Sequence, residues 1–321
     1  MQLDDPQRTS QRMALILTAA ILGQLTAGCT PNIVATPSPV ATPADAPRTG
    51  APASGPPAGS TQVSPVDGMR MVFVPAGEFE MGSAIGLTDE QPVHTVYLDA
   101  FWIDQTEVSN AQYAQCAEAG ACELPSVTAS YDDHNLADHP VAFVSWNKAQ
   151  DYCGWAGRRL PTEAEWEKAA TWNPTTAEKY VYPWGDTFDC GKANFDDETR
   201  LDSSIMPGST VNCDGFPRTA PAGSFPAGAS PYGALDMAGN VWEWVYDAFI
   251  ETDPLTASIQ NYYAVSPAAN PQGVDPAITD YRGMRGGSWG WTFGYGRSAY
   301  RLWYGLDDSY DNVGFRCAQS P

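Results

Sequence analysis

Every aromatic residue of this 321-residue chain lies after position 65, although aromatic residues make up 12% of the composition. A segment without aromatic side chains forms little core, because these rings supply much of the apolar area that folding buries. Residues 30–65 also hold nine prolines and only two charged residues, Asp45 and Arg48. Such a segment buries too little apolar surface to offset its chain entropy. The sequence therefore predicts one folded domain over 66–319, preceded by a disordered tether over 29–65.

Residues 1–28 have the pattern of an export signal. Arg8 and Arg12 precede an apolar run over 13–25, which is too short for a permanent membrane helix. The run ends in Leu-Thr-Ala-Gly-Cys29, which resembles a lipobox, where the cysteine is diacylated and becomes the mature N-terminus. The alternative is an ordinary signal peptide followed by an incidental cysteine. The lipobox predicts an exported domain that is anchored through Cys29 to the cell membrane or the outer membrane.

The net charge of the chain is −21, from 17 basic and 38 acidic residues. A nucleic-acid partner is not expected, because the chain has no basic surface to neutralise phosphates. The acidity either keeps the protein soluble or supplies carboxylates that bind cations.

Six cysteines remain when the predicted lipid anchor is set aside: Cys116, Cys122, Cys153, Cys190, Cys213 and Cys317. An even number in an exported chain predicts three disulfides, with fifteen possible pairings. Cys116 and Cys122 flank a short loop and are expected to pair, and Cys190 could pair with Cys213. That leaves Cys153 with Cys317. A zinc site is not expected, because the chain has no C-x-x-C and only three histidines.

The local patterns of the domain mix short strands with short helices. Apolar alternation predicts strands over 71–75, 78–81 and 93–103. Helices are predicted over 110–118, 146–156 and 163–171. Ser109 and Ser145 can cap the first two helices, and Thr162 with Glu165 forms a capping box for the third. Few helices and many loops favour an irregular α+β fold.

Eight stretches in fixed order resemble the formylglycine-generating-enzyme (sulfatase-modifying-factor) family. They include Gly-Arg-Arg-Leu-Pro-Thr-Glu from Gly157 and Arg-Gly-Gly-Ser-Trp from Arg285, and they span 71–82, 101–113, 140–146, 157–167, 182–186, 239–244, 285–289 and 314–317. The resemblance covers about 66–318. It implies an irregular, loop-rich α+β fold related to C-type lectins, and it supports the pairing of Cys153 with Cys317.

The resemblance also implies two structural calcium ions. The residues that match the first site are Asn194, Phe195, Asp214 and Phe216, where the two phenylalanines would offer carbonyl oxygens. The residues that match the second are Asp236, Gly239, Val241 and Glu243, with Glu243 as the charged ligand. Several oxygen ligands of this kind suit calcium. The alternative is that these are ordinary turns with solvated acids, although Glu243 lies between two tryptophans.

The family oxidase converts a cysteine of a sulfatase to formylglycine, and it holds copper through two cysteines shortly after Gly-Gly-Ser. Thiolates select copper(I), so this chemistry needs sulfur at that place. Here Gly286-Gly287-Ser288 is present, but no cysteine lies between Cys213 and Cys317. Copper and the oxidase reaction are therefore not expected, and the sequence identifies no catalytic residue.

Two other kinds of enzyme also lack support in the sequence. Iron-dependent sulfoxide synthases of this fold carry histidine ligands on an additional helical domain, which this chain lacks. Its histidines at 94, 134 and 139 form no cluster on a helix face, and no hydrolase motif is present. Each histidine is expected to be structural or on the surface.

The segment after Arg285 is the candidate ligand groove. Trp289, Trp291, Phe293 and Tyr295 alternate, so a strand would point all four rings to one face. The groove candidates are Ser288, Trp291, Phe293, Tyr295, Tyr304, Asp307 and Asp308. Such a face could stack on sugars, peptides or cationic groups. The alternative is that half of the rings belong to the core, Trp289 and Trp303 above all, while Arg297 and Arg301 form structural ion pairs.

Three functions fit these observations. The first is a binding or accessory module with an unknown protein, peptide or glycan ligand. The second is a divergent oxidoreductase or protein-maturation enzyme of the same family, and the third is the oxidase itself without its usual ligands. A hypervariable binding surface between the Gly-Gly-Ser-Trp and Gly-Phe-Arg motifs, as in retroelement-diversified proteins of this fold, is a further option.

Overall fold

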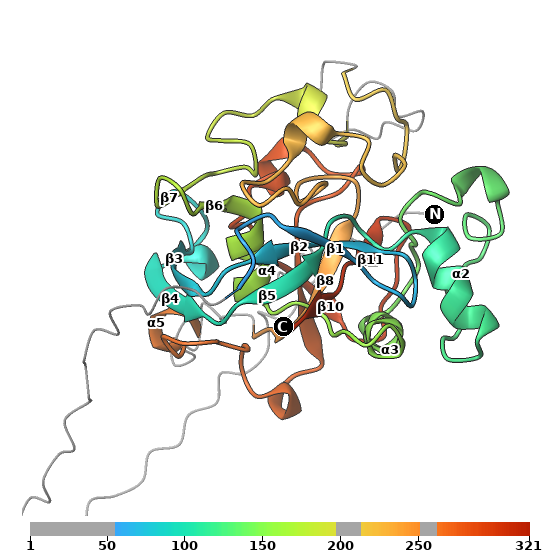
Figure 1. Ribbon diagram of the computed structural model, residues 1–321, viewed down its shortest axis with the longest axis horizontal. Helices are drawn as coiled ribbons and strands as arrows, with labels where there is room; N and C mark the ends of the chain where they lie inside the picture. Colours follow the sequence, from blue (N-terminus) through green and yellow to red (C-terminus); the bar gives the residue numbers. More distant parts are fainter. Residues whose placement is uncertain (1–54, 197–212, 251–261) are drawn as a thin grey trace, which may run out of the picture. The chain divides into compact units, whose positions relative to one another are not determined.

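The computed structural model describes residues 55–196, 213–250 and 262–321 (Figure 1). The predicted signal segment, most of the predicted tether and Cys29 lie outside these ranges. Strand β1 (Thr61–Val63) pairs antiparallel with β2 (Arg70–Val74), so the folded part begins before residue 66, inside the segment predicted to be tether. No helix in the described ranges is long and apolar enough to cross a membrane.

Two four-stranded sheets form the frame of the domain, in the orders β1-β2-β5-β12 and β10-β9-β8-β11. Their further strands are β5 (Phe101–Asp104), β8 (Trp242–Ala248), β9 (Tyr281–Arg285), β10 (Leu302–Gly305), β11 (Val313–Phe315) and β12 (Ala318–Gln319). Two hairpins add β3 (Gly77–Met81) with β4 (His94–Leu98), and β6 (Trp172–Asn173) with β7 (Glu178–Lys179). Because β12 pairs with β5 and β11 with β8, the C-terminal segment takes part in both sheets.

The predicted strand over 93–103 is wrong as a single element. The structure has two strands there, and they belong to different sheets: β4 pairs with β3, and β5 pairs with β2 and β12. The chain breaks at Asp99, whose backbone N–H donates to Asn270 Oδ1 and whose carboxylate accepts from Asn270 Nδ2. The side chain of Asn270 therefore accepts from the backbone N–H that a neighbouring strand would bind if the strand continued through Asp99.

The three predicted helices are confirmed. They are α2 (Asn110–Glu118), α3 (Trp146–Trp155) and α4 (Glu163–Thr171), and a short α5 (Tyr262–Val265) follows later in the chain. Ser109 and Ser145 accept hydrogen bonds from backbone N–H groups in the first turns of their helices. At α4 the Thr162 hydroxyl accepts from the Glu165 N–H, and the Glu165 carboxylate accepts from the Thr162 N–H. These caps are local, which is why the sequence located the helix starts correctly.

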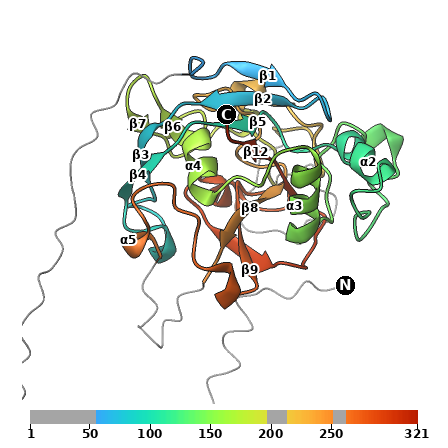
Figure 2. The same ribbon diagram turned by 60° about the horizontal axis from the view of Figure 1, so that its bottom comes forward.

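Helix α4 is buried along its whole length, although four of its nine residues are charged. Figure 2 shows it below the first sheet, and it contacts β3, β4, β8 and β9. Each charge has a partner: Glu163 pairs with Arg285 and Arg301, Glu165 with Arg159, Glu167 with Arg285 and Lys179, and Lys168 donates to the carbonyls of Pro75 and Gly77. Helix α4 is therefore core despite its charges, because they are matched by Arg159 just before the helix and by residues of other elements.

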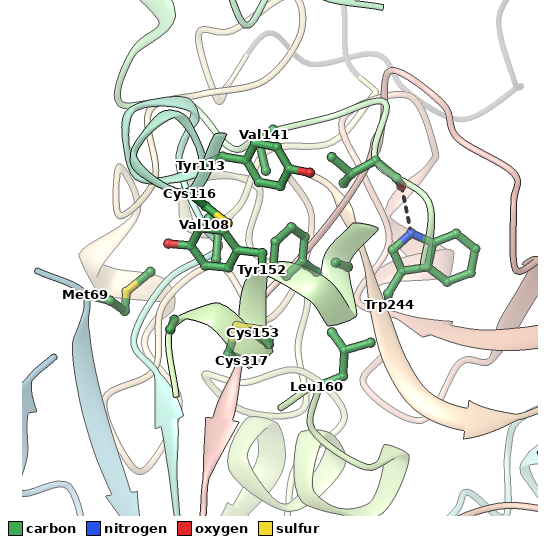
Figure 3. Packing of buried hydrophobic residues seen from close by; sticks show 14 of the residues in the cluster. Met69, Val108, Tyr113, Cys116, Val141, Tyr152, Cys153, Leu160, Trp244 and Cys317 are labelled. Carbon is green, nitrogen blue, oxygen red and sulfur yellow. Dashed lines mark hydrogen bonds between the residues drawn. A yellow bond between two sulfur atoms is a disulfide. The ribbon is translucent and has the colours of Figure 1, made fainter. Parts of the chain in front are cut away.

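The largest apolar cluster lies around α2 and α3 (Figure 3). Tyr113 of α2 stacks on Tyr152 of α3 with ring centroids 5.6 Å apart, and Trp244 of β8 donates its Nε1–H to the Val144 carbonyl at 3.0 Å. The disulfide between Cys153 and Cys317 ties α3 to the C-terminal segment inside this cluster. All three predicted disulfides are present, the others being Cys116–Cys122 and Cys190–Cys213.

A buried ionic group lies beside this disulfide. Arg158 pairs with both Asp67 and Asp104, and Asp104 also accepts the Cys317 N–H at 2.8 Å. One guanidinium cannot fully compensate two buried carboxylates. The pKa of Asp67 is lowered, since burial, which acts to raise it, is outweighed by Arg158 and several hydrogen bonds. Burial raises the pKa of Asp104 to about 7, because it outweighs the charge of Arg158 there.

Asp104 is expected to make the protein less stable as the pH rises towards neutrality. Its folded pKa of about 7 lies above its ordinary value of 3.8, so the folded state holds the proton more tightly than the unfolded chain. The resulting stabilisation is full below 3.8 and is lost as the pH rises to about 7. Urea unfolding across this range should show wild type losing stability relative to Asp104→Asn, with no further change above it. A difference that is constant with pH would contradict this assignment.

Candidate functional site

The aromatic run after Ser288 does not form the predicted strand. Residues Phe293–Gly296 form a single 3-10 turn, and Tyr295 N–H donates to the Thr292 carbonyl at 3.0 Å. Gly296 lies so close to Phe195 that a Cβ there would be 2.1 Å from its ring. Glycine at this position lets the chain curl over Phe195, so the alternating rings point in different directions instead of sharing one face.

Two of the predicted rings join a four-ring group that we call the aromatic cluster: Trp242, Trp291, Tyr295 and Tyr300. Trp291 and Tyr295 meet edge to face with centroids 4.7 Å apart, and Tyr295 and Tyr300 do so at 5.0 Å. Trp242 lies beneath, 5.9 Å from Trp291 and 6.0 Å from Tyr300. Trp242 is fully buried, whereas the other three rings are half-buried and pack on the main core. The cluster therefore offers part of its ring surface to a ligand.

Trp242 carries a polar feature that the sequence did not reveal. Its Nε1–H is buried, and it has no hydrogen-bond partner among the described residues. A buried donor of this kind costs about 1–3 kcal/mol unless something accepts from it. Neither Trp242 nor Tyr300 was among the predicted groove residues, because their place in the cluster depends on how β8 and the segment before β10 pack together.

Phe293 and Ser288 do not belong to the aromatic cluster. Phe293 is 41% exposed and stacks on Phe188 at 4.5 Å, in contact with a smaller apolar group around Phe195. Ser288 is fully buried and accepts a hydrogen bond from Asn312 Nδ2 at 3.1 Å. Both were predicted to line the groove, and the structure gives Ser288 a structural position instead.

The remaining candidates lie further along the same segment. Tyr304 is half-buried on the main core and packs against Tyr310 at 4.7 Å. Asp307 and Asp308 are exposed; Asp307 accepts from Asn147 Nδ2, and Asp308 accepts from the Gly305 N–H, each at 2.9 Å. Because both carboxylates are exposed, they can bind a cationic group at the protein surface.

The other two tryptophans of the segment are structural. Trp289 is 5% exposed, which confirms the expectation that it is core, and the guanidinium of Arg218 lies 5.3 Å from its ring. Trp303 is half-buried between Phe249 and Tyr281.

The predicted ion pairs of Arg297 and Arg301 are confirmed. Arg297 binds Glu90 through both terminal nitrogens, at 2.7 and 2.6 Å, and Arg301 binds Glu163. Arg297 and Lys179 also line a cavity of about 160 Å³ whose walls are mainly apolar. Both cations of this cavity are held by buried glutamates, so neither is a free anchor for an anion.

The residues of the first implied calcium site fit a cation. Asn194 is 1% exposed, and its Oδ1 is buried without a hydrogen-bond partner in the described part of the chain. Asp214 binds the backbone N–H groups of Phe195 and Phe216, at 3.0 and 2.9 Å, which draws the two segments together. The four residues that the family resemblance assigns to this site are thus neighbours in the fold.

The second implied site does not fit as predicted. Glu243 is fully buried, but Arg316 holds both of its oxygens at 2.6 Å, and Trp166 Nε1–H donates to it at 2.7 Å. A carboxylate that is already neutralised by a guanidinium is a poor charged ligand for calcium. Asp236, in contrast, interacts with Glu107, a residue that no sequence pattern singled out.

Glu107 and Asp236 form a buried acid pair, with exposed fractions of 0% and 5%. Burial, and then the charge of Asp236, raise the pKa of Glu107 well above its ordinary value. Burial likewise raises the pKa of Asp236, although the Gly223 N–H opposes the effect. The signal that could have identified Glu107 is its place in the Thr-Glu-Val-Ser-Asn motif from Thr106, where a buried charge is otherwise unexplained.

Asn240 connects the two implied sites. Its Oδ1 accepts from Asn194 Nδ2 at 3.1 Å and from the Ala220 N–H at 2.8 Å, while its Nδ2 donates to Glu107 at 2.9 Å. Gly239 is required beside it, since a Cβ would lie 2.3 Å from the Asn194 carbonyl oxygen. No group of three or more His, Cys, Asp or Glu side chains suited to a metal is found in the described residues, so a cation here would rely on carbonyl oxygens as well.

The fold and these sites define a disulfide-bonded, loop-rich α+β domain with an aromatic cluster and buried acids. Residues 58–321 match the family model of the sulfatase-modifying factor enzyme 1-like domain, and the chain belongs to this family. The predicted fold class is thereby confirmed.

Relatives of this chain have more than one activity. It is 34% identical to the formylglycine-generating enzyme of Streptomyces coelicolor, over 77% of this chain and 88% of that protein. It is 30% identical to the hercynine oxygenase of Mycolicibacterium smegmatis, over 72% of this chain but only 57% of that protein. Among solved structures, PvdO from Pseudomonas aeruginosa has a TM-score of 0.64 at 24% identity, covering 83% of this chain and all of that one, which shows the shared fold.

Proposed function

We propose that this protein is an exported, lipid-anchored binding or accessory module that uses the family fold without copper chemistry. The observation that carries this proposal is the absence of thiolates where the family oxidase needs them. No cysteine lies between Cys213 and Cys317, and all six cysteines of the domain are paired in disulfides. Aromatic rings take up the stretch after Gly-Gly-Ser instead.

The aromatic cluster is the proposed ligand face. Half-buried rings at Trp291, Tyr295 and Tyr300 give stacking surface above the fully buried Trp242. The exposed Asp307 and Asp308 lie in the same C-terminal segment and favour a positive group. A peptide with a basic residue or a glycan meets these requirements, since both combine a stacking surface with hydrogen-bond acceptors.

The first experiment tests the protein for oxidase activity. The purified chain, supplied with copper and a Cys-x-Pro-x-Arg peptide, is expected to consume no oxygen and to leave the peptide thiol intact. Peptide-dependent oxygen uptake would overturn the proposal. It would instead support a divergent oxidoreductase or maturation enzyme of the family, the second candidate, which the 34% identity over 88% of a formylglycine-generating enzyme favours.

Substitution of Trp291 is expected to weaken ligand binding. On glycan and basic-peptide arrays, Trp291→Ala should reduce binding to the probes that wild type retains by about tenfold, equivalent to about 1.4 kcal/mol. Phe293→Ala is the matched control, because Phe293 is more exposed but stacks on Phe188 outside the aromatic cluster. Equal losses for both variants, or no loss for Trp291→Ala, would exclude the cluster as the ligand face.

The lipid anchor and the first calcium ion complete the proposal. Cys29→Ser is expected to move the protein from the membrane fraction to the soluble fraction, as judged by immunoblotting.

Calcium at the first site would be held by Asn194 and Asp214 with the carbonyls of Phe195 and Phe216. Its chemistry is structural, since it joins two loops, and Asn194→Ala should lower the calcium content of the purified protein.

A further inference from the structure

Arg282 of β9 is a buried arginine without an acidic partner. Its side chain is 6% exposed, and its Nη1 donates to the backbone carbonyls of Thr279 and Tyr281, at 2.9 and 3.0 Å. Asp280 is the nearest acid in the chain, but it is exposed and forms no ion pair with Arg282. The other buried arginines of the described residues all bind carboxylates: Arg158, Arg285, Arg301 and Arg316.

One end of the Arg282 guanidinium remains available at the surface. Its Nη2 has no hydrogen-bond partner among the described residues and is not enclosed by protein, whereas its Nε is fully buried. The two backbone carbonyls fix the plane of the guanidinium, so the N–H groups of Nη2 point in a defined direction. Arginine donors held in this way suit a carboxylate, because the resulting hydrogen bonds are charge-assisted.

Aromatic rings from three elements lie around Arg282, and together with it they form what we call the Arg282 site. Arg282 Cζ lies 4.8 Å from the centre of the Trp146 ring at the start of α3, and Tyr304 of β10 is directly opposite Arg282 in the antiparallel pair. Tyr246 of β8 lies 6.2 Å from Trp146. Helix α3 lies beside β8 and β9 (Figure 2), and Trp146 Nε1–H donates to the Val245 carbonyl at 2.8 Å. The three rings are half-buried, so part of their surface is open to a ligand.

A negative charge lies next to this site. Asn147, which follows Trp146, donates its Nδ2 to Asp307 Oδ1 at 2.9 Å. Asp307 is exposed, and its Oδ2 has no hydrogen-bond partner in the described part of the chain. Because Trp146 and Asn147 are consecutive, the cation of Arg282 and the anion of Asp307 lie on either side of the start of α3. A ligand that carries both charges matches this arrangement, whereas a purely anionic ligand is opposed by the net charge of −21.

We infer that the Arg282 site binds the C-terminal residue of a peptide that ends in lysine or arginine. The terminal carboxylate accepts from Arg282 Nη2, the basic group pairs with Asp307, and the methylene groups of the side chain lie on the Trp146 ring. A sugar acid offers the carboxylate but lacks the cation that Asp307 would bind. The Arg282 site specifies the ligand class of the proposed binding role and rests on that role, but it shares no residue with the aromatic cluster.

Fluorescence polarisation with labelled peptides tests this site. The probe is the peptide Gly-Ser-Tyr-Lys, labelled at its N-terminus and with a free C-terminal carboxylate. It is compared with its C-terminal amide and with a peptide that ends in norleucine in place of lysine. The purified wild-type chain should bind the probe about tenfold more tightly than either comparison peptide, because each of them lacks one charged contact. Equal binding of the carboxylate and the amide, a result that needs no variant, would overturn the inference.

Two variants assign the contacts to their residues. Arg282→Met should remove the preference for the carboxylate over the amide, and Asp307→Asn should remove the preference for lysine over norleucine. Arg218→Met is the matched control, since Arg218 also lies over a tryptophan, Trp289, at 5.3 Å but outside the site. It should keep both preferences. If Arg282→Met does not fold, Arg282→Lys replaces it and should reduce the preference severalfold, because lysine lacks the planar donor pair.

Failure of the Arg282 site can be distinguished from failure of the proposed ligand face. If Trp291→Ala weakens binding while carboxylate and amide bind equally, the aromatic cluster is the ligand face and the Arg282 site is rejected. If the carboxylate preference persists and Trp291→Ala has no effect, the Arg282 site is supported and the cluster is rejected. Binding of glucuronic acid without binding of any of the peptides would also overturn the inference, since the site would then select a sugar acid.

Discussion

Arg316→Met is expected to lower the free energy of unfolding by about 3–5 kcal/mol, enough to leave little folded protein if wild type has ordinary stability. The substitution removes a guanidinium with no exposed area that makes five hydrogen bonds. It leaves Glu243 buried with, among the described residues, only the Trp166 Nε1–H as a donor. The acid pair of Glu107 and Asp236 also loses the nearest positive charge.

The matched control for this prediction is Arg218→Met. Arg218 pairs with Asp311 at 3.2 Å, but the two side chains are 65% and 41% exposed, so its loss should cost less than about 1 kcal/mol. Urea unfolding of both variants, monitored by tryptophan fluorescence, measures the difference. If the two variants are equally stable, the buried pair of Arg316 and Glu243 contributes no more to folding than a surface pair.

Removing the disulfide between Cys153 and Cys317 is expected to have a comparable effect. The two cysteines are 164 residues apart, so the link restricts most of the unfolded domain, and its loss should cost about 5 kcal/mol in the chain-entropy model. The double variant Cys153→Ala with Cys317→Ala keeps both positions apolar in a core where each is fully buried. The main cost is therefore the freedom gained by the unfolded chain.

The disulfide between Cys116 and Cys122 provides the comparison within the same protein. It closes a loop with a sequence separation of only six, so its removal should cost about 2 kcal/mol in the same model. Thermal and urea unfolding of the two double-alanine variants should therefore differ clearly. Equal losses would show that local packing, and not loop closure, determines what these disulfides contribute.

The acid pair shows how much of the candidate site could be predicted from sequence. The motif from Gly239 to Trp244 correctly indicated a buried acid at Glu243, and the family resemblance brought Asp236 and Asn194 to attention. Which partner each acid has depends on Arg316, which is 73 residues from Glu243 in the chain. No local pattern contains that information, so the sequence showed neither the ion pair of Glu243 nor the burial of Glu107.

The sequence by itself determined those features whose causes are local or covalent. The helix starts at Ser109, Ser145 and Thr162 follow from side chains that bond backbone groups three residues away. The three disulfide pairs, the family and the fold class also followed from it. The missing thiolates after Ser288 likewise need no structure.

Only the tertiary structure decided where the chain breaks at Asp99, why Trp291 and Tyr295 leave Phe293 outside their cluster, and which buried acids have counter-ions. Asn270 binds the backbone of Asp99, and Phe195 leaves room only for glycine at position 296, where the chain turns. Both residues are far in the chain from the positions that they affect. Arg316 decides the third by neutralising Glu243 and leaving Glu107 with Asp236. Each of these outcomes depends on steric contact or charge compensation between elements that are neighbours only after folding.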